Sequence, residues 1–284
     1  MKRTFIFVFS GIFLWPGCVG LTPRVAPVSF ENPFTRLEIV TVQPSAKEQA
    51  GLTLRFLPWA GGRLNSTEET TVYAGVQNDR GSLIKLIQNN TETYRSGSRR
   101  DTYIVRTEAS FQGWPGSILE ELEMSQRGEI VKFMQGKHDS KDGRFTIANW
   151  TRTPMFPEHA VKVGESWGYE ETMSLRLDSF WVKQTDKSPY KMKATSTLAG
   201  FSEVKGRRCA VIETSADQIQ TLRFKVLFKS ITLYVRAKIR ETTYLDYKTG
   251  AVMAKIAKIQ SYTNSADSKI NDYSISQTIS YQRS

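Results

Sequence analysis

The sequence predicts a mainly β fold made of antiparallel sheet, with few and short helices. From about Gly51 onward, apolar residues alternate with polar or small ones. This two-residue period is typical of a strand with one buried and one solvent-exposed face. These alternating segments are rich in Thr, Val, Ile and Tyr, and turn residues at 78–81, 205–206 and 248–250 separate them.

The predicted strands all lie after residue 50. Evidence for helices is thin. Residues 45–49 can form a short turn, whereas residues 117–124 suit a helix or a strand, and residues 217–228 are ambiguous in the same way. The alternating segments, in chain order, are residues 51–57, 70–76, 102–107, 190–198, 209–214, 231–246, 251–262 and 273–281.

Residues 153–167 join two β-rich halves. Pro154 and Pro157 exclude a ladder strand or a regular helix here, so we expect an extended crossing segment. Gly164 allows a tight turn, after which Trp167 can anchor the segment in the core.

The two halves contain a similar pattern. Residues 123–132 and 246–255 each read as strand, polar turn, glycine and strand. A duplication of two halves gives this pattern, and so do two unrelated hairpins, because glycine after a polar residue is what such turns need. Both interpretations remain open.

The N-terminus has the order of a secretory signal peptide. Lys2 and Arg3 precede an uncharged apolar segment over residues 4–15, and small residues follow. This segment is shorter than the roughly 20 residues that span a bilayer as a helix. We therefore predict a signal peptide over residues 1–17, a proline-containing tether over residues 18–50, and a β-rich domain over residues 51–284.

Cys18 directly after Gly17 resembles the processing site of bacterial lipoproteins, in which the cysteine carries the lipid anchor. Trp15 and Pro16 are atypical of that site, and the alternative is an ordinary signal cleavage near Gly20. By the same resemblance, Val19 favours the outer membrane over retention at the inner one. We expect an exported envelope protein, on the periplasmic face of the outer membrane.

Composition limits the chemistry that the chain can perform. The 284 residues carry a net charge of +11, which falls to +9 without Lys2 and Arg3, and they include two cysteines and two histidines. This excludes a disulfide framework and a cysteine-rich zinc site. Gly-x-Ser-x-Gly, a glycine-rich phosphate loop and a Cys–His arrangement are absent. We therefore expect no catalytic residue, no metal and no cofactor.

Three segments resemble a group of exported bacterial β-rich proteins of unknown function. Residues 156–167, with Val161, Gly164 and Trp167, resemble its P-x-x-x-V-x-x-G-[DE]-[ST]-W segment. Residues 206–212 and 245–250 resemble its G-x-x-C/A-x-x-I hairpin and its x-D-x-x-T-G turn. The group is similar to the outer-membrane lipoprotein carrier and to mycobacterial lipid-binding lipoproteins. The resemblance implies a curved antiparallel half-barrel with an apolar concavity able to hold acyl chains.

A basic stretch is the strongest candidate for a binding surface. Alternation in residues 236–240 places the charges on one face of a strand. A solvent-exposed sheet face explains this pattern, because Lys and Arg side chains there prevent aggregation. The functional interpretation is a patch for anionic headgroups of an envelope lipid. The candidate residues are Arg223, Lys225, Lys229, Arg236, Lys238 and Arg240.

The apolar residues Phe224, Val226 and Phe228 alternate with basic ones next to this stretch. Core packing explains them, and the wall of an acyl-chain cavity is the alternative. Cys209 lies in an apolar strand and is expected to be a buried, inert thiol.

The function expected from these observations is non-enzymatic. A monomeric envelope protein would bind the acyl chains of a lipid or lipoprotein in the concavity of its sheet, while Cys18 tethers it to the membrane. The alternative is a structural or accessory envelope protein that binds a protein partner or the cell wall. Export makes nucleic acid a poor partner.

Overall fold

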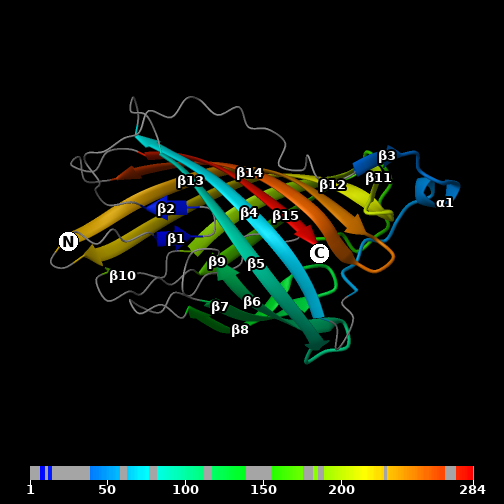
Figure 1. The fold of residues 1–284 in the computed structure, drawn as a ribbon, viewed down its shortest axis with the longest axis horizontal. Coiled ribbons are helices and arrows are strands. Elements are labelled where there is room, and N and C mark those ends of the chain that lie inside the picture. Colours follow the sequence, from blue (N-terminus) through cyan, green and yellow to red (C-terminus); the bar gives the residue numbers. More distant parts are fainter. Residues whose placement is uncertain are drawn as a thin grey trace.

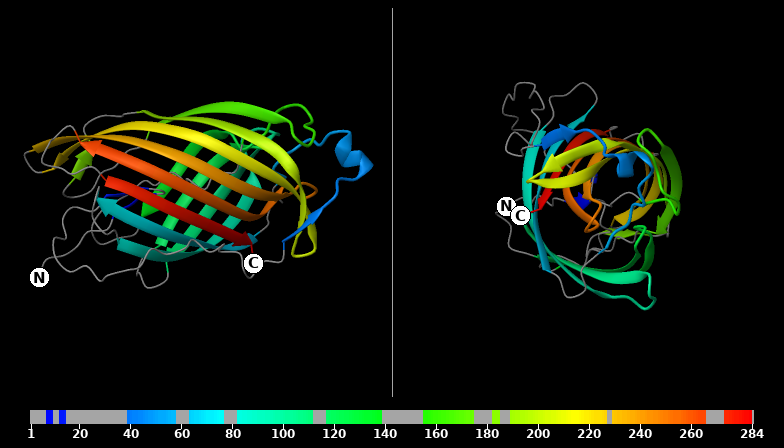
Figure 2. Two further views of the ribbon diagram at one scale, coloured as in Figure 1. Left: turned by 90° about the horizontal axis from the view of Figure 1, so that it is seen from above. Right: turned by 90° about the vertical axis from the view of Figure 1, so that its right-hand side faces the viewer.

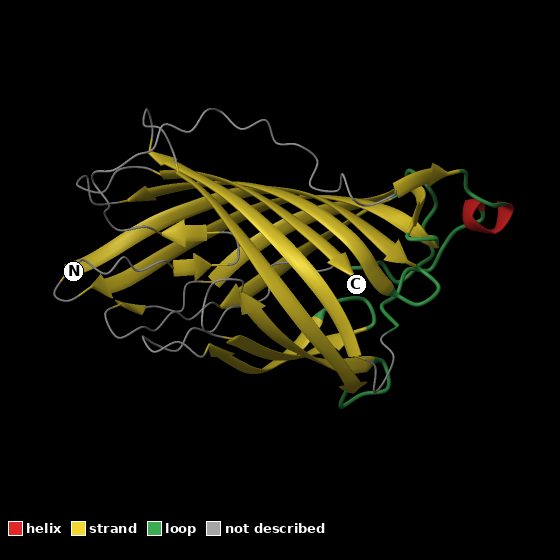
Figure 3. Ribbon diagram, in the orientation of Figure 1, coloured by secondary structure: helices red, strands yellow, loops and turns green. Residues whose placement is uncertain are grey.

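The alternating segments of the sequence form long antiparallel strands in the computed structural model, which confirms the predicted mainly β, half-barrel-like fold. The structure describes residues 7–9, 12–14, 39–57, 63–76, 82–111, 117–138, 155–174, 182–184, 189–226, 229–265 and 273–283. The one helix in these ranges is α1 (Ala46–Gln49), at one end of the sheet (Figure 3).

Fifteen strands lie within the described ranges. They are β1 (Phe7–Phe9), β2 (Ile12–Leu14), β3 (Ile39–Val42), β4 (Arg63–Val76), β5 (Ser82–Ser96), β6 (Thr102–Phe111), β7 (Ser117–Ser125), β8 (Ile130–His138), β9 (Ser166–Ser174), β10 (Val182–Gln184), β11 (Pro189–Val204), β12 (Arg207–Val226), β13 (Lys229–Asp246), β14 (Ala251–Ser265) and β15 (Tyr273–Arg283).

Thirteen of these strands form one sheet, whose order follows the chain in two meanders. Strands β4 to β8 make the first meander and β11 to β15 the second, and β15 pairs antiparallel with β4 to join them. Strands β3 and β9 pair with β11, and β10 pairs with β12. Among the described residues the sheet stays open between β8 and the edge formed by β3 and β9. Figures 1 and 2 show the resulting strong curl.

Strand pairing shows that the two segments whose local pattern suited either a helix or a strand are strands. Residues 117–124 lie in β7, between β6 and β8. Residues 217–226 lie in β12, which pairs with β13 along this whole segment and, on its other side, with β11 up to Ile219 and with β10 from Phe224 to Val226. The predicted turn at Lys205 and Gly206 connects β11 to β12 with φ of 51° and 70°. Two positive φ values in a two-residue loop match the twist of the strands that the turn joins.

Two crossing segments close one end of the curl. Residues 155–165 are extended and irregular, as expected for the join, and residues 51–57 run beside them. Leu52 and Val161 exchange backbone hydrogen bonds of 2.8 and 3.0 Å. The rings of Phe56 and Phe156 lie 4.4 Å apart, centroid to centroid. We call residues 51–57 and 155–165 the plug.

The plug connects strands near both edges of the sheet. Phe156 N donates to Arg127 O in the turn after β7, and Gly164 N donates to Leu198 O of β11. The large buried cluster of apolar side chains lies here, and it includes Leu54, Phe56, Phe156, Val161, Trp167, Leu198, Phe201, Ile212 and Leu245.

The prediction of a strand over residues 51–57 was wrong. The alternation is real, since Leu54 and Phe56 are buried, but it reflects an extended segment. Only Leu52 forms a β-bridge, and Phe56 N instead donates to Gln126 O. Side-chain alternation does not reveal which backbone groups are paired.

The folded chain also begins earlier than the predicted boundary at residue 51. Strand β3 pairs residues 39–42 with 201–204 of β11, and α1 follows it. Residues 39–50 are therefore part of the folded protein. The residues before 39, Cys18 among them, lie outside the described ranges apart from β1 and β2, so the signal peptide and the lipid anchor remain predictions.

Strands β1 and β2 form a separate apolar hairpin within the predicted signal peptide. Phe7 pairs with Leu14 and Phe9 with Ile12. In Figures 1 and 2 this hairpin lies inside the curl of the large sheet.

Candidate functional site on the concave face

The strands of the second meander have one exposed and one buried face. Along β12, Ser215 and Asp217 are exposed, whereas Ala216 and Gln218 are buried. The sheet is a single curled layer (Figure 2), so its buried side chains line the inner, concave face and its exposed ones the outer, convex face.

The predicted basic residues of β13 lie on the convex face. Arg236, Lys238 and Arg240 are exposed, and they alternate with the buried Val235 and Ala237. Arg223 of β12 is exposed as well. The side chains of Lys225 and Lys229 lie outside the described part of the structure.

Neighbouring strands extend this row. Lys258 of β14 pairs with Arg240, and Ile219 of β12 pairs with Arg236. Lys258 is exposed, and Ile219 is 59% exposed. The one acidic residue in direct register with the row is Asp217, which pairs with Lys238. Sequence reasoning missed Lys258 because strand register is set by tertiary pairing.

The residues of the predicted apolar wall cannot be assigned to the concave or the convex face. Phe224 and Val226 are in β12, where their backbones pair with Ile231 and Lys229 of β13. Their side chains and the whole of Phe228 lie outside what the structure describes. These three residues remain a prediction.

Side-chain size changes along the concave face. Next to the plug, Leu198, Ile212 and Leu245 are fully buried. Farther along the same strands the buried residues become small, and alanines from β11 and β12 face each other in register at Ala194 and Ala216. We call this region the alanine section, formed by Ala194, Ala216, Ala237, Ala257, Ile239 and Ile259.

A buried polar row separates the plug from the alanine section. Lys255 Nζ lies 3.4 Å from Glu241 Oε2, and the two side chains are 2% and 9% exposed. Thr243 Oγ1 donates to Glu241 Oε1 at 2.8 Å. One strand away, the hydroxyl oxygens of Ser196 and Thr214 lie 2.8 Å apart. These groups satisfy one another, as buried polar groups must.

Two glutamines lie beyond the alanine section on the same face. Gln218 and Gln220 of β12 are each 2% exposed. The Nε2 atom of each is buried without a hydrogen-bond partner. Sequence reasoning missed both, because a glutamine in an alternating segment gives no signal of its burial.

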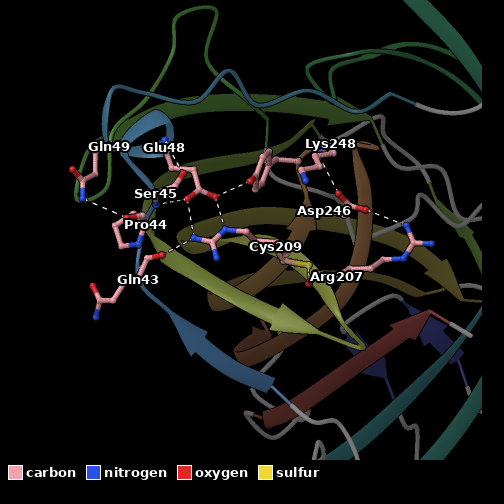
Figure 4. Close-up of polar contacts among 11 residues, drawn as sticks. Gln43, Pro44, Ser45, Glu48, Gln49, Arg207, Cys209, Asp246 and Lys248 are labelled. Carbon is pink, nitrogen blue, oxygen red and sulfur yellow. Dashed lines mark hydrogen bonds and ion pairs between the residues drawn. The ribbon is translucent and has the colours of Figure 1, made fainter.

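A second polar cluster holds the N-terminal segment on the sheet (Figure 4). Glu48 of α1 accepts from Arg208 Nε at 2.7 Å and Nη2 at 2.8 Å, from Tyr247 Oη at 2.7 Å and from Ser45 N at 2.6 Å. The Arg208 guanidinium is the main cause that holds the pKa of Glu48 far below its usual range. Both carboxylate oxygens are occupied, so this cluster is structural.

Three other titratable residues are also engaged in the fold. Glu123 accepts from Ser98 and Thr102, and these hydrogen bonds, those of the Ser98 side chain first, lower its pKa to about 2. Glu121 pairs with Arg95 at 2.6 Å. Cys209 is fully buried, which raises the pKa of its thiol to about 12 and makes it unreactive.

No family model matches the sequence, and no curated protein matches it either. In the ranges that the structure describes, no helix has the length and apolar character needed to cross a bilayer.

Proposed function

We propose that this chain is an exported, non-enzymatic envelope protein that holds the acyl chains of a lipid or lipoprotein against its concave face. The observation that carries the proposal is the alanine section. Four buried alanines on adjacent strands of a curled sheet give this part of the inner side a small, apolar lining, where larger side chains lie near the plug.

The free energy of burying apolar surface favours an apolar ligand. Each methylene of an acyl chain that leaves water for an apolar surface contributes about 0.8 kcal/mol. Ile239 and Ile259 beside the alanines offer such a surface. The apolar β1–β2 hairpin inside the curl supports the same idea, because removal of a signal peptide would vacate that space.

The convex basic row has a different role in this proposal. Arg236, Lys238, Arg240 and Lys258 lie on the opposite face from the alanine section, so they would contact a membrane surface rather than the bound molecule. Each basic residue near an anionic membrane contributes about 1 kcal/mol. A lipid anchor at Cys18 would keep the protein near that surface, on the periplasmic face of the outer membrane.

Native mass spectrometry tests the proposal. Residues 21–284, produced in a bacterial periplasm, should carry an acyl species in stoichiometric amount that organic extraction releases. Replacing Ala216 with Phe should reduce this cargo, whereas Ser215→Phe, on the neighbouring convex position, should leave it unchanged. A clean apo mass for the unaltered chain contradicts the proposal.

An apo mass would favour the second candidate, an accessory protein that binds an envelope partner. The observation behind it is the open edge at β8, which pairs only with β7 among the described strands. An unpaired edge can accept a strand from another chain. A partner that co-purifies and protects β8 from amide hydrogen exchange would support this candidate.

A further inference from the structure

The two buried glutamines suggest what the polar part of the cargo is. Gln218 and Gln220 lie two positions apart on β12, so both side chains project from the concave face, next to the alanine section. Their Cα atoms are about 6.6 Å apart along the strand. Both Nε2 donors lack a partner.

The residues in described register with these glutamines do not supply a strong acceptor. In register, Gln218 lies between Met192 of β11 and Ala237 of β13, and Gln220 lies opposite Val235. All three neighbours have apolar side chains. A buried amide donor that is left unsatisfied destabilises the protein, because it has lost its hydrogen bonds to water without gaining others. A ligand acceptor would remove that destabilisation.

The charge inside the curl indicates which kind of acceptor fits. The buried Lys255 is paired with Glu241, so this ion pair is electrically balanced. The unpartnered groups on β12 are neutral amides rather than cations. An uncharged acceptor is therefore favoured over a carboxylate or phosphate, whose burial would require a counter-charge.

We infer that Gln218 and Gln220 donate hydrogen bonds to the ester carbonyl oxygens of an acyl glyceride whose chains occupy the alanine section. This inference rests on the proposed function and deepens it by naming the ligand class. Two carbonyls on adjacent glycerol carbons suit two donors on one strand face. The charged headgroup, where the lipid has one, lies outside the concave face.

A competition between ester and ether lipids tests the inference. Vesicles of ether-linked phosphatidylcholine would contain equal amounts of dioleoylglycerol and of its dialkyl ether analogue, which lacks both carbonyls. The delipidated protein would be incubated with them and separated, and both glycerides bound to it would be measured by mass spectrometry. The two hydrogen bonds predict an ester preference of about 30-fold.

The double variant Gln218→Leu/Gln220→Leu should bind the ether lipid as the unaltered protein does and lose the ester preference. Gln260→Leu is the matched control, because Gln260 is exposed on β14 and should leave the preference intact. The double variant should remain folded, because its substitutions remove two unsatisfied amides. Urea unfolding checks this.

The outcomes separate this inference from the proposed function. Binding of both lipids without an ester preference, or a preference that persists in the double variant, overturns the role of the glutamines and leaves the carrier function standing. Binding of neither lipid to the unaltered protein overturns both.

Discussion

The buried ion pair on the concave face gives the sharpest prediction of stability. Glu241→Gln removes the negative charge that lies 3.4 Å from the Nζ atom of Lys255, whose side chain is 2% exposed. Breaking a buried pair in this way costs about 3–5 kcal/mol, because an uncompensated charge stays in a medium of low polarity. Replacing both partners with Met should instead be neutral or stabilising.

Urea unfolding at pH 7 measures this effect. With a slope of about 2 kcal/mol per molar urea, Glu241→Gln should lower the midpoint by about 1.5–2.5 M. Glu170→Gln is the matched control, because Glu170 pairs with Lys193 at 2.8 Å on the exposed face of the same sheet. That pair is worth at most about 1 kcal/mol. Equal, small shifts for both variants would show that water reaches Glu241, and would refute the buried polar row.

Three further predictions concern the Glu48 cluster, the plug and the convex face. Glu48→Gln should destabilise the protein at neutral pH, and its difference from the unaltered protein in urea should shrink as pH falls below about 4.5, because protonation abolishes the Arg208 contact. Gly250→Ala should destabilise strongly, because its φ is +68° and a Cβ would lie 2.0 Å from Leu57 N; thermal unfolding measures the loss. Vesicle sedimentation at low salt should show about 100-fold weaker binding to anionic membranes after charge reversal of Arg236, Lys238 and Arg240.

Each of these has a control in the same chain. The pKa of Glu48 is lowered by folding, so its contribution is complete above the unfolded value and declines progressively as pH falls from there through the folded value; a difference that does not shrink between pH 5 and pH 2 would contradict the role of the Glu48 cluster. Gly206 has a φ of +70° with nothing within 4 Å, so Gly206→Ala should cost only the backbone strain of about 1 kcal/mol. Equal losses at both glycines would contradict the plug's close approach. Reversal of the exposed Lys47, Lys162 and Lys248 should change vesicle binding little.

Local pattern was enough to predict the strands of the second meander, whereas β5 and β9 were not among the predicted segments. Residues 231–240 alternate between apolar and polar side chains and lie in β13, and the strand period placed Arg236, Lys238 and Arg240 on one face. The turn residues Lys205, Gly206 and Gly250 adopt the positive φ that their chemistry favours. Ser45 caps α1 through a capping box with Glu48, in the segment expected to form a short turn.

Long-range pairing could not be predicted, and the candidate site depends on it. The join of β4 to β15, the register that sets Lys258 beside Arg240, and the contact between Glu241 and Lys255 all link residues far apart or on different strands. The amide donors of Gln218 and Gln220 are notable only because the curl buries them. Periodicity fixes which residues share a face, but curvature decides which face is inside.

The central claim is that acyl chains lie against the alanine section, and photo-crosslinking tests it most directly. The mature protein would be loaded with a diacylglycerol that carries a diazirine near the end of one chain, irradiated, digested and mapped by mass spectrometry. The account predicts modified residues on the concave face, at positions such as Ala216 and Ala237. Labels confined to convex positions such as Ser215 and Lys238, or no label above a denatured control, would contradict it.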